Sequence, residues 1–181
     1  MLPRVYTAMP SRRWRRKIVD VLALLESLQS DLGETGGTVT LEGQARAPYP
    51  GRVQALRRCI GNLLENAIKY GQRAHVVVDD SDAQLALHVR DEGPGIPAEE
   101  IDKVFEPFYR VEGSRNRDTG GTGLGLAIAR GVAELHGGRI TLKNRETGGL
   151  EATVVLPRTA EGRVTRPVRR RAAITSPARC G

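Results

Sequence analysis

The sequence predicts an α/β (α+β) fold, a two-layer sandwich whose mixed, largely antiparallel sheet is covered by helices on one face. Apolar residues recur at helical spacing in two long segments, and strand-like segments come in adjacent pairs joined by short turns. The predicted order is helix, strand, helix, strand, strand, helix, helix, strand, strand. Adjacent strand pairs fit poorly with a doubly wound parallel sheet and favour the two-layer sandwich.

Two helices dominate the first half of the chain. Within residues 18–32 the apolar side chains stand at i, i+3, i+4, i+7 and i+11, which forms one helical stripe. Residues 38–41 form a candidate strand, and two prolines in the following ten residues mark a loop. The clearest helical pattern covers residues 53–70, and Gly71 is a natural stop.

The second half of the chain contains shorter elements. Turn residues separate two strand patterns, and a proline followed by two glutamates is typical of a helix start. A polar segment rich in glycine, serine and arginine predicts a mobile loop. The elements expected here are strands 75–80 and 84–91, a helical segment 97–104, a loop 111–121, a helix 122–136, and strands 139–144 and 151–156.

Length and composition exclude several classes of protein. The 181 residues fit one domain with flanks, and two cysteines cannot form a disulfide framework. Cys59 falls in a helical pattern and is interpreted as a buried small residue, whereas Cys180 is interpreted as an incidental thiol. No apolar run approaches the length of a membrane span, and the N-terminus lacks the apolar stretch of a signal peptide. We therefore expect a cytoplasmic protein.

The net charge of +7 is concentrated at the two ends of the chain. Residues 1–17 hold six basic residues and no acid, and residues 158–181 hold seven arginines and one acid, which leaves −5 for residues 18–157. A nucleic-acid reader usually carries its positive charge on the fold itself, so no specific nucleic-acid partner is expected. We expect a basic N-terminal flank, a domain over 18–157 and an Arg-rich disordered tail. A weak contact of these ends with an acidic partner is the alternative.

The first candidate site lies on the second long helix. Asn62, Asn66 and Lys69 stand at i, i+4 and i+7, and Arg58 extends this polar stripe by one turn. Asparagine is a mediocre helix former, so two on one stripe suggest a function. A carboxamide oxygen can coordinate Mg²⁺ while lysine meets phosphate oxygens. A solvated helix face is an equally good interpretation of the stripe alone.

The second candidate site is Asp91-Glu92-Gly93-Pro94-Gly95-Ile96-Pro97. Alternation along the preceding strand places Asp91 on the same face as its apolar residues. A carboxylate there costs several kcal/mol unless it finds donors, and the exocyclic amine of a purine is one suitable donor. Gly93 and Gly95 would let a flat ring approach the backbone. The alternative is a plain turn.

The third candidate site is the glycine-rich run of residues 120–128, which leads into a helix. Such a helix start presents free backbone N–H groups and the positive end of the helix dipole, which favour phosphate. The spacing fits neither a P-loop nor a dinucleotide-binding fingerprint. A flexible glycine-rich loop is the alternative interpretation.

An aromatic segment, residues 105–110, lies between the second and third sites. It is expected to anchor the predicted loop to the core, and ordinary packing is the preferred interpretation for both Phe105 and Phe108.

Together, in this order and spacing, the four segments resemble the ATP-binding catalytic (HATPase) domain of bacterial sensor histidine kinases. This domain belongs to the GHKL superfamily, which also includes gyrase, a heat-shock chaperone and mismatch-repair ATPases. The resemblance runs from about residue 20 to Pro157 and implies a Bergerat-type ATP-binding fold. Residues 62–70 resemble the asparagine box, 91–95 the first glycine box, 105–110 the phenylalanine box and 121–125 the second glycine box.

The resemblance implies ATP and Mg²⁺ as ligands, together with a role for each matching residue. Asn66 resembles the Mg²⁺ ligand, and Asp91 resembles the carboxylate that accepts from the adenine amine. Residues 111–121 resemble the lid over the triphosphate. The residues implied to bind ATP are Asn62, Asn66, Lys69, Tyr70, Asp91, Gly93, Gly95, Ile96, Arg110, Gly121, Thr122, Gly123, Leu124 and Gly125.

The sequence departs from the family at the phosphoacceptor. The family uses a histidine followed by an acidic residue on a helical hairpin, whereas His75, His88 and His136 have no acidic neighbour. About 17 residues precede the first predicted helix, too few for that hairpin. No catalytic residue is therefore assigned within this chain. The expected partners are a histidine-containing dimerisation hairpin in trans and, through it, a response regulator.

The leading functional hypothesis is a histidine protein kinase domain that needs a separate hairpin. One alternative is a non-catalytic ATP-binding regulatory module, and another is an anti-sigma-factor-like serine kinase. The Asn-Ala-Ile-Lys-Tyr and Gly-Thr-Gly-Leu-Gly-Leu runs favour the histidine-kinase branch over the serine kinase.

Overall fold

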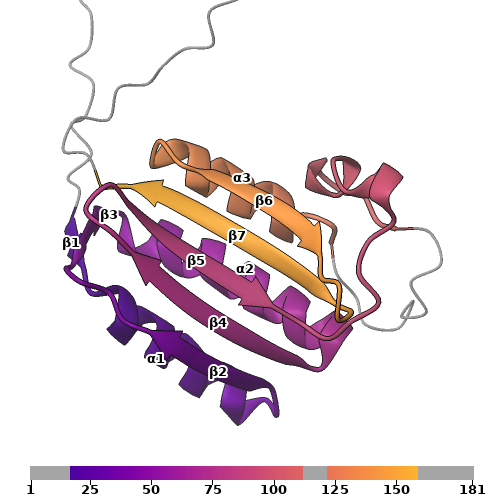
Figure 1. Cartoon of the computed structure of the whole chain (residues 1–181), viewed down its shortest axis with the longest axis horizontal. Helices are drawn as coiled ribbons and strands as arrows, with labels where there is room; N and C mark the ends of the chain where they lie inside the picture. Colours follow the sequence, from indigo (N-terminus) through magenta and orange to yellow (C-terminus); the bar gives the residue numbers. More distant parts are fainter. Residues whose placement is uncertain (1–16, 112–121, 159–181) are drawn as a thin grey trace, which may run out of the picture.

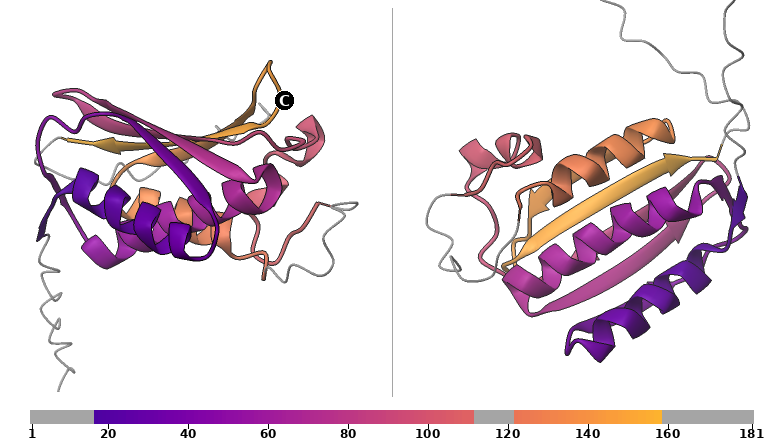
Figure 2. Two further views of the ribbon diagram at one scale, coloured as in Figure 1. Left: turned by 90° about the horizontal axis from the view of Figure 1, so that it is seen from below. Right: turned by 180° about the vertical axis from the view of Figure 1, so that it is seen from behind.

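A five-stranded sheet in the order β2-β4-β5-β7-β6 forms one layer, and the helices lie together on one of its faces (Figures 1 and 2). The computed structural model describes residues 17–111 and 122–158. The β2–β4 pair is parallel, and the other neighbouring pairs are antiparallel. The predicted sandwich with a mixed, largely antiparallel sheet is thereby confirmed. The strands are β2 (Thr38–Gly43), β4 (Arg73–Asp80), β5 (Gln84–Arg90), β6 (Arg139–Asn144) and β7 (Leu150–Pro157).

Three helices cover the sheet, with α2 (Val53–Gly71) between α1 (Val21–Glu34) and α3 (Gly125–Leu135) (Figure 2). The first helix begins where the Asp20 side chain accepts a hydrogen bond from the Ala23 N–H at 3.1 Å. The Asp20 side chain thus satisfies one of the backbone N–H donors that the start of a helix leaves without a partner. No helix within 17–111 and 122–158 is both long enough and apolar enough to cross a membrane.

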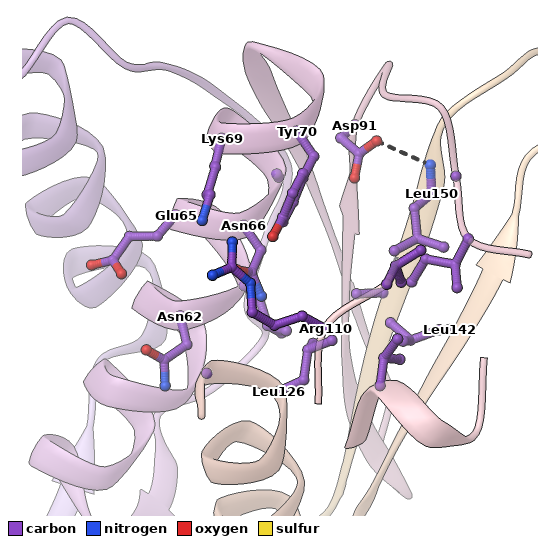
Figure 3. A pocket seen from close by; sticks show the side chains of 18 of the residues that line it. Asn62, Glu65, Asn66, Lys69, Tyr70, Asp91, Arg110, Leu126, Leu142 and Leu150 are labelled. Atoms are coloured by element: carbon purple, nitrogen blue, oxygen red, sulfur yellow. Dashed lines mark hydrogen bonds between the residues drawn. The ribbon is translucent and has the colours of Figure 1, made fainter. Parts of the chain in front are cut away.

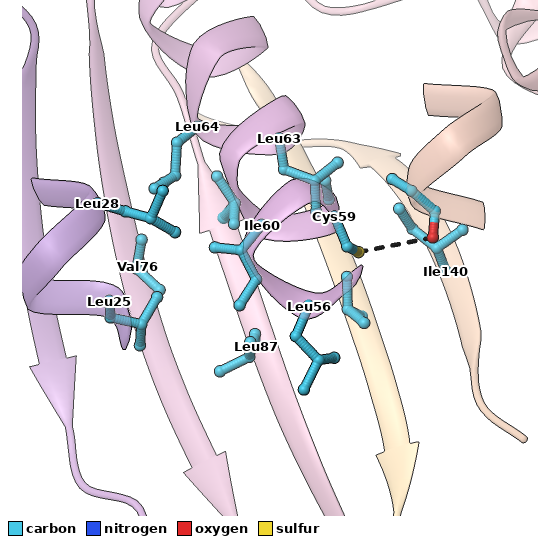
Figure 4. Packing of buried hydrophobic residues seen from close by; sticks show 14 of the residues in the cluster. Leu25, Leu28, Leu56, Cys59, Ile60, Leu63, Leu64, Val76, Leu87 and Ile140 are labelled. Atoms are coloured by element: carbon cyan, nitrogen blue, oxygen red, sulfur yellow. Dashed lines mark hydrogen bonds between the residues drawn. The ribbon is translucent and has the colours of Figure 1, made fainter. Parts of the chain in front are cut away.

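The core lies between α2 and the sheet, as Figure 4 shows. Leu64 and Leu25 from the helices and Val76 and Leu87 from the strands are at most 1% exposed. Burying each leucine contributes roughly 1.5–3 kcal/mol, and the helical periodicity that predicted α1 and α2 arises from these contacts. Cys59 is also buried, as expected, and burial raises its pKa to about 12. Cys180 lies outside the described residues.

A two-stranded ribbon is the main element that the sequence did not predict. The short strands β1 (Lys17–Val19) and β3 (Tyr49–Gly51) pair antiparallel, where a helix from residue 18 and a proline-marked loop were expected. Asp20 caps α1, so the helix begins at Val21 and leaves Val19 in the strand. Pro50 is tolerated in β3 because a two-stranded ribbon leaves each strand one outer edge without a partner.

The elements on either side of the predicted loop differ from the prediction. The segment predicted as a helix over 97–104 forms two 3₁₀ turns, η1 (Ala98–Glu100) and η2 (Lys103–Phe105). The α3 helix begins at Gly125 rather than residue 122, because Gly123 adopts a positive φ of 70° that a helix cannot contain. Residues 112–121 of the expected loop lie outside the described residues.

The last described residue, Arg158, is ordered, although the sequence places it in a disordered tail. Its guanidinium donates to the carbonyl oxygens of Ala47 at 2.6 Å and Pro48 at 3.3 Å. The same group lies 5.9 Å from the centre of the Tyr49 ring. The domain therefore extends one residue past the predicted boundary, because a long arginine can reach back over the loop that precedes β3.

Candidate functional site

A cavity of about 750 Å³ lies between α2, the end of β5, the loop before η1 and the start of α3 (Figure 3). Its walls bring together parts of all four motif segments, which are far apart in the sequence. Of the residues predicted for the site, the cavity is lined by Asn62, Asn66, Lys69, Tyr70, Asp91, Gly95, Ile96, Arg110, Thr122, Gly123 and Gly125. Gly93 and Leu124 are not among the lining residues, and Gly121 lies outside the described residues.

The polar stripe of α2 forms one wall of this cavity. Asn62, Asn66 and Lys69 project from the helix toward the cavity, while the opposite face of α2 packs on the sheet (Figure 3). The Nδ2 atom of Asn62 is shielded from solvent and has no hydrogen-bond partner in the described part of the chain. An unpaired buried donor costs roughly 1–3 kcal/mol. A ligand that brought an acceptor oxygen to Asn62 would remove this cost.

Asp91 lies at the opposite end of the cavity and is 8% exposed. Its Oδ1 atom accepts hydrogen bonds from the backbone N–H groups of Gly93 at 2.8 Å and Leu150 at 3.1 Å. No donor among the described residues reaches its second oxygen, Oδ2. The carboxylate is thus held in place by one oxygen, and the other can accept from a ligand.

The surroundings of Asp91 are apolar. Val89 continues the same strand face, and three further side chains come from the hairpin formed by β6 and β7. A single carboxylate in an apolar slot suits a flat ring that carries one amine. The hairpin residues that line this slot are Leu142, Leu150 and Ala152.

Gly93 has a structural role behind the cavity. A Cβ atom at this position would lie 2.8 Å from the backbone oxygen of Tyr70, at the end of α2. The absence of a side chain therefore lets the segment after β5 pass close to the helix end. This close approach places Asp91 beside the stripe of α2.

The start of α3 forms the third wall. Gly123, at positive φ, accepts a hydrogen bond from the Phe108 N–H at 3.0 Å, and Gly125 faces Asn62 and Asn66. No side chain in the described segments caps the N-terminus of α3. The first N–H groups of the helix and the positive end of its dipole therefore remain available to an anion.

The aromatic segment divides into a packed half and an exposed half. Phe105 packs against the core, and the Arg130 guanidinium lies 5.4 Å from its ring centre. Phe108 is 72% exposed and adopts a φ of 68°, so the expectation of ordinary packing is wrong for this residue. Its backbone bond to Gly123 holds it in this conformation and keeps the ring off the core.

Several cavity residues were not predicted from the sequence. Glu65, one turn from Asn62 and Lys69 on α2, could have been found from the helical spacing. Leu142 and Leu150 could not be found from the sequence, because an apolar residue in a strand pattern is normally interpreted as part of the core. The described residues contain no group of three or more His, Cys, Asp or Glu that could hold a metal ion.

Residues 51–160 match the family model described as histidine kinase-, DNA gyrase B-, and HSP90-like ATPase. The sensor histidine kinase GtrS of Pseudomonas aeruginosa is 48% identical over 122 residues, which cover 67% of this chain and 25% of GtrS. The histidine-protein kinase BaeS of Escherichia coli is 36% identical over 151 residues, which cover 80% of this chain and 32% of BaeS. The chain thus spans about a quarter to a third of these relatives.

Solved structures give the same assignment. The mycobacterial sensor histidine kinase MprB superposes with a TM-score of 0.67 at 28% identity, covering 78% of this chain and 97% of that one. The ATP binding domain of PrrB from Mycobacterium tuberculosis superposes with a TM-score of 0.65 at 27% identity, covering 81% of this chain and 99% of that one. The resemblance carried by the four segments is therefore confirmed. The chain belongs to the histidine kinase-, DNA gyrase B- and HSP90-like ATPase family, and it holds the nucleotide-binding domain that its sensor histidine kinase relatives share.

Proposed function

We propose that this domain binds ATP with Mg²⁺ and transfers the γ-phosphoryl group to a histidine on a dimerisation hairpin supplied in trans. A response regulator would then receive the phosphoryl group from that hairpin. One observation supports the proposal above the others: a single cavity has a carboxylate in an apolar slot at one end, and amide, cationic and helix-start groups at the other. These two ends match the two ends of a purine nucleotide.

At the base end, Asp91 would accept from the exocyclic amine of adenine. Its Oδ1 is already bonded to two backbone N–H groups, so Oδ2 is the oxygen available to the ligand. An ionised carboxylate only accepts hydrogen bonds, and this favours an amine over the carbonyl that guanine carries at the same ring position. The apolar side chains around it would cover the two faces of the ring.

At the phosphate end, three kinds of donor would share the negative charge. Lys69 supplies a cation, the start of α3 supplies backbone N–H groups, and Asn62 supplies the unpaired Nδ2. Arg110 lines the same cavity. Donors fixed in place before the ligand arrives act mainly by positioning and by neutralising charge, which is what phosphoryl transfer requires.

A divalent cation fits the same end by the chemistry of the available donors. Asn66, with Asn62 beside it, offers neutral amide oxygens, and Mg²⁺ typically takes few protein ligands while phosphates and water complete its shell. Because the described residues contain no cluster of metal-binding side chains, the cation would arrive with the nucleotide. When bound, it would neutralise charge on the phosphate oxygens.

The acceptor histidine would come from outside the domain. His75 is hydrogen bonded to Thr40 on β2, and His88 to Thr153 on β7. His136 follows α3, so about 16 Å of helix separates it from the start of α3 at ~1.5 Å per residue. None of the three can reach the phosphate end without unfolding the elements that form it. Because the reaction consumes ATP, we place it in the cytoplasm.

Two measurements test this proposal. Calorimetric titration with ADP and ATP, with and without Mg²⁺, should show binding, and a hundredfold excess over the dissociation constant should stabilise the domain by about 2.7 kcal/mol. Absence of any heat or stability change at millimolar nucleotide would contradict the binding site. Labelled ATP should then phosphorylate an added hairpin from a related sensor histidine kinase, with an acid-labile product.

The controls separate the possible functions. A hairpin whose histidine is replaced by alanine should stay unlabelled, and the domain alone should not label itself. Nucleotide binding without transfer to any hairpin would favour a non-catalytic module. An acid-stable product on serine would favour a serine kinase.

A further inference from the structure

The last residue of β6, Asn144, binds the loop that borders the base end of the cavity. Its Oδ1 accepts from the Ile96 N–H at 2.9 Å, and its Nδ2 donates to the Ile96 carbonyl oxygen at 2.6 Å. Ile96 lies between β5 and η1, where no strand or helix satisfies its backbone groups. A carboxamide suits this place because it offers a neutral donor and a neutral acceptor side by side.

Gly95 lies directly against this contact. It adopts a φ of 75°, and a Cβ atom here would lie 2.5 Å from the Oδ1 atom of Asn144. A side chain at 95 would therefore displace the carboxamide from the Ile96 backbone. Gly95 is therefore needed for the contact between Asn144 and Ile96, in addition to the room that it would leave for a flat ring.

The next residue of the hairpin, Arg145, holds Asp91 itself. Its Nη1 donates to the Asp91 carbonyl oxygen at 2.8 Å. On the other side of the hairpin, Leu150 accepts from the Asp91 N–H at 3.0 Å and donates its own N–H to the Asp91 carboxylate. The proposed amine acceptor and the loop beside it are therefore both attached to one hairpin, at residues 144–150.

We propose that Asn144 and Arg145 are positioning residues that set how well the site distinguishes adenine from other purines. Recognition of the amine needs the Asp91 carboxylate and the Ile96 backbone at a fixed separation, and these two side chains connect both to the same rigid strand pair. Asn144 is itself exposed, so its loss would release the loop without opening the core. The inference rests on the proposed function, because it assigns a role within the same nucleotide site.

The test compares ADP with inosine diphosphate, in which an oxygen replaces the adenine amine. Calorimetry in excess Mg²⁺ gives the ratio of the two affinities for the unmodified chain and for Asn144→Leu. We expect the preference for ADP to fall about three- to tenfold, the size produced by losing one or two hydrogen bonds. Lys143→Leu changes the neighbouring exposed residue of β6 and should leave the ratio unchanged.

Two further measurements support the test: a second, more conservative variant, and an exchange experiment that needs no nucleotide. Asn144→Asp keeps the acceptor for the Ile96 N–H but sets a second oxygen against the Ile96 carbonyl oxygen, so its preference for ADP should also fall below that of the unmodified chain, which tests the role even if Asn144→Leu does not fold. In the ligand-free protein, the Ile96 amide should exchange with solvent faster in Asn144→Leu than in the unmodified chain, whereas Asn144→Asp, which keeps the acceptor, should not show this increase.

The outcomes separate this inference from the function on which it rests. An unmodified chain that binds neither nucleotide would overturn both. An unmodified chain that prefers ADP, with variants that lose affinity for both nucleotides equally, would overturn only the positioning role.

Discussion

The guanidinium of Arg158 binds both carboxylate oxygens of Asp80, each at 2.5 Å, where the Asp80 side chain has no exposed surface. The Arg158 side chain is itself only 12% exposed. Burial alone would raise the pKa of Asp80, but the hydrogen bonds and charge of Arg158, with backbone donors, hold that pKa below its ordinary value. This pair joins the end of β4 to the end of β7.

Replacing Arg158 should therefore destabilise the domain strongly. Arg158→Ala leaves a buried carboxylate without its cation, and removing one partner of a buried pair typically costs about 3–5 kcal/mol. Chemical denaturation at pH 7 measures the loss. Arg46→Ala is the matched control, because the Arg46 side chain pairs with Asp82 where both are exposed, and it should cost less than about 1 kcal/mol. Similar losses for the two variants would contradict the assigned role of Arg158.

The same pair predicts a dependence of stability on pH. A carboxyl whose pKa is lowered by folding contributes stability above its unfolded pKa, 3.8 for Asp80, and loses it as the pH falls through the lower folded value. The stability difference between the unmodified chain and Arg158→Ala should thus be largest near neutral pH and shrink toward acid, because burial without the arginine raises the pKa of Asp80 in the variant. Denaturation curves at several pH values measure it, and a difference that grows toward acid would have the wrong sign.

Asp91→Asn should weaken adenine nucleotides more than guanine nucleotides. The amide can keep its oxygen at the Oδ1 position, facing the N–H groups of Gly93 and Leu150, and then presents an NH₂ group where the free oxygen had been. The lost match should cost roughly 1–3 kcal/mol for ADP and less for GDP, measured by calorimetric titration. Glu92→Gln, at an exposed neighbour that pairs with Arg73, is the control. Equal losses for both purines would mean that Asp91 does not recognise the base.

Cys59 should be chemically inert in the folded protein. Burial raises its pKa to about 12, and the reactive thiolate is scarce at neutral pH in a side chain that is 1% exposed. In a Cys180→Ser background, a thiol reagent should modify Cys59 only as denaturant unfolds the domain. The absorbance of the released product measures the extent of modification. Complete modification within minutes without denaturant would show that α2 opens locally.

Elements that show periodicity within a single segment could be predicted from the sequence. Elements that form only by pairing with a distant segment could not. Periodicity predicted the polar stripe of α2, and the structure confirms that this stripe lines the cavity. Periodicity also predicted a shared strand face, whose members are all buried: Leu85, Leu87, Val89 and Asp91. The β1–β3 ribbon was missed because three-residue strands are too short to show alternation.

The candidate site divides in the same way. Asp91 and Asn66 stand in recognisable motifs, and the cavity brings them together as expected. Asn144 and Arg145 were missed because polar residues at the end of a strand carry no periodic signal, and their contacts join segments about fifty positions apart. The binding role of Asp91 and the positioning role of Asn144 remain predictions that the titrations above test.

Tyr49 brings the two ends of the described domain together. It pairs with Val19, its hydroxyl donates to the Pro157 carbonyl oxygen at 3.2 Å, and its ring lies beside Arg158. In Figure 1 this meeting point is at the opposite end of the sheet from η1 and η2. A short linker could therefore join the first strand to the last without crossing the cavity. The domain is thus suited to circular permutation, with new termini in the turn at residues 81–83, where Asp82 and Ala83 are exposed, and to attachment at either end with the cavity left open.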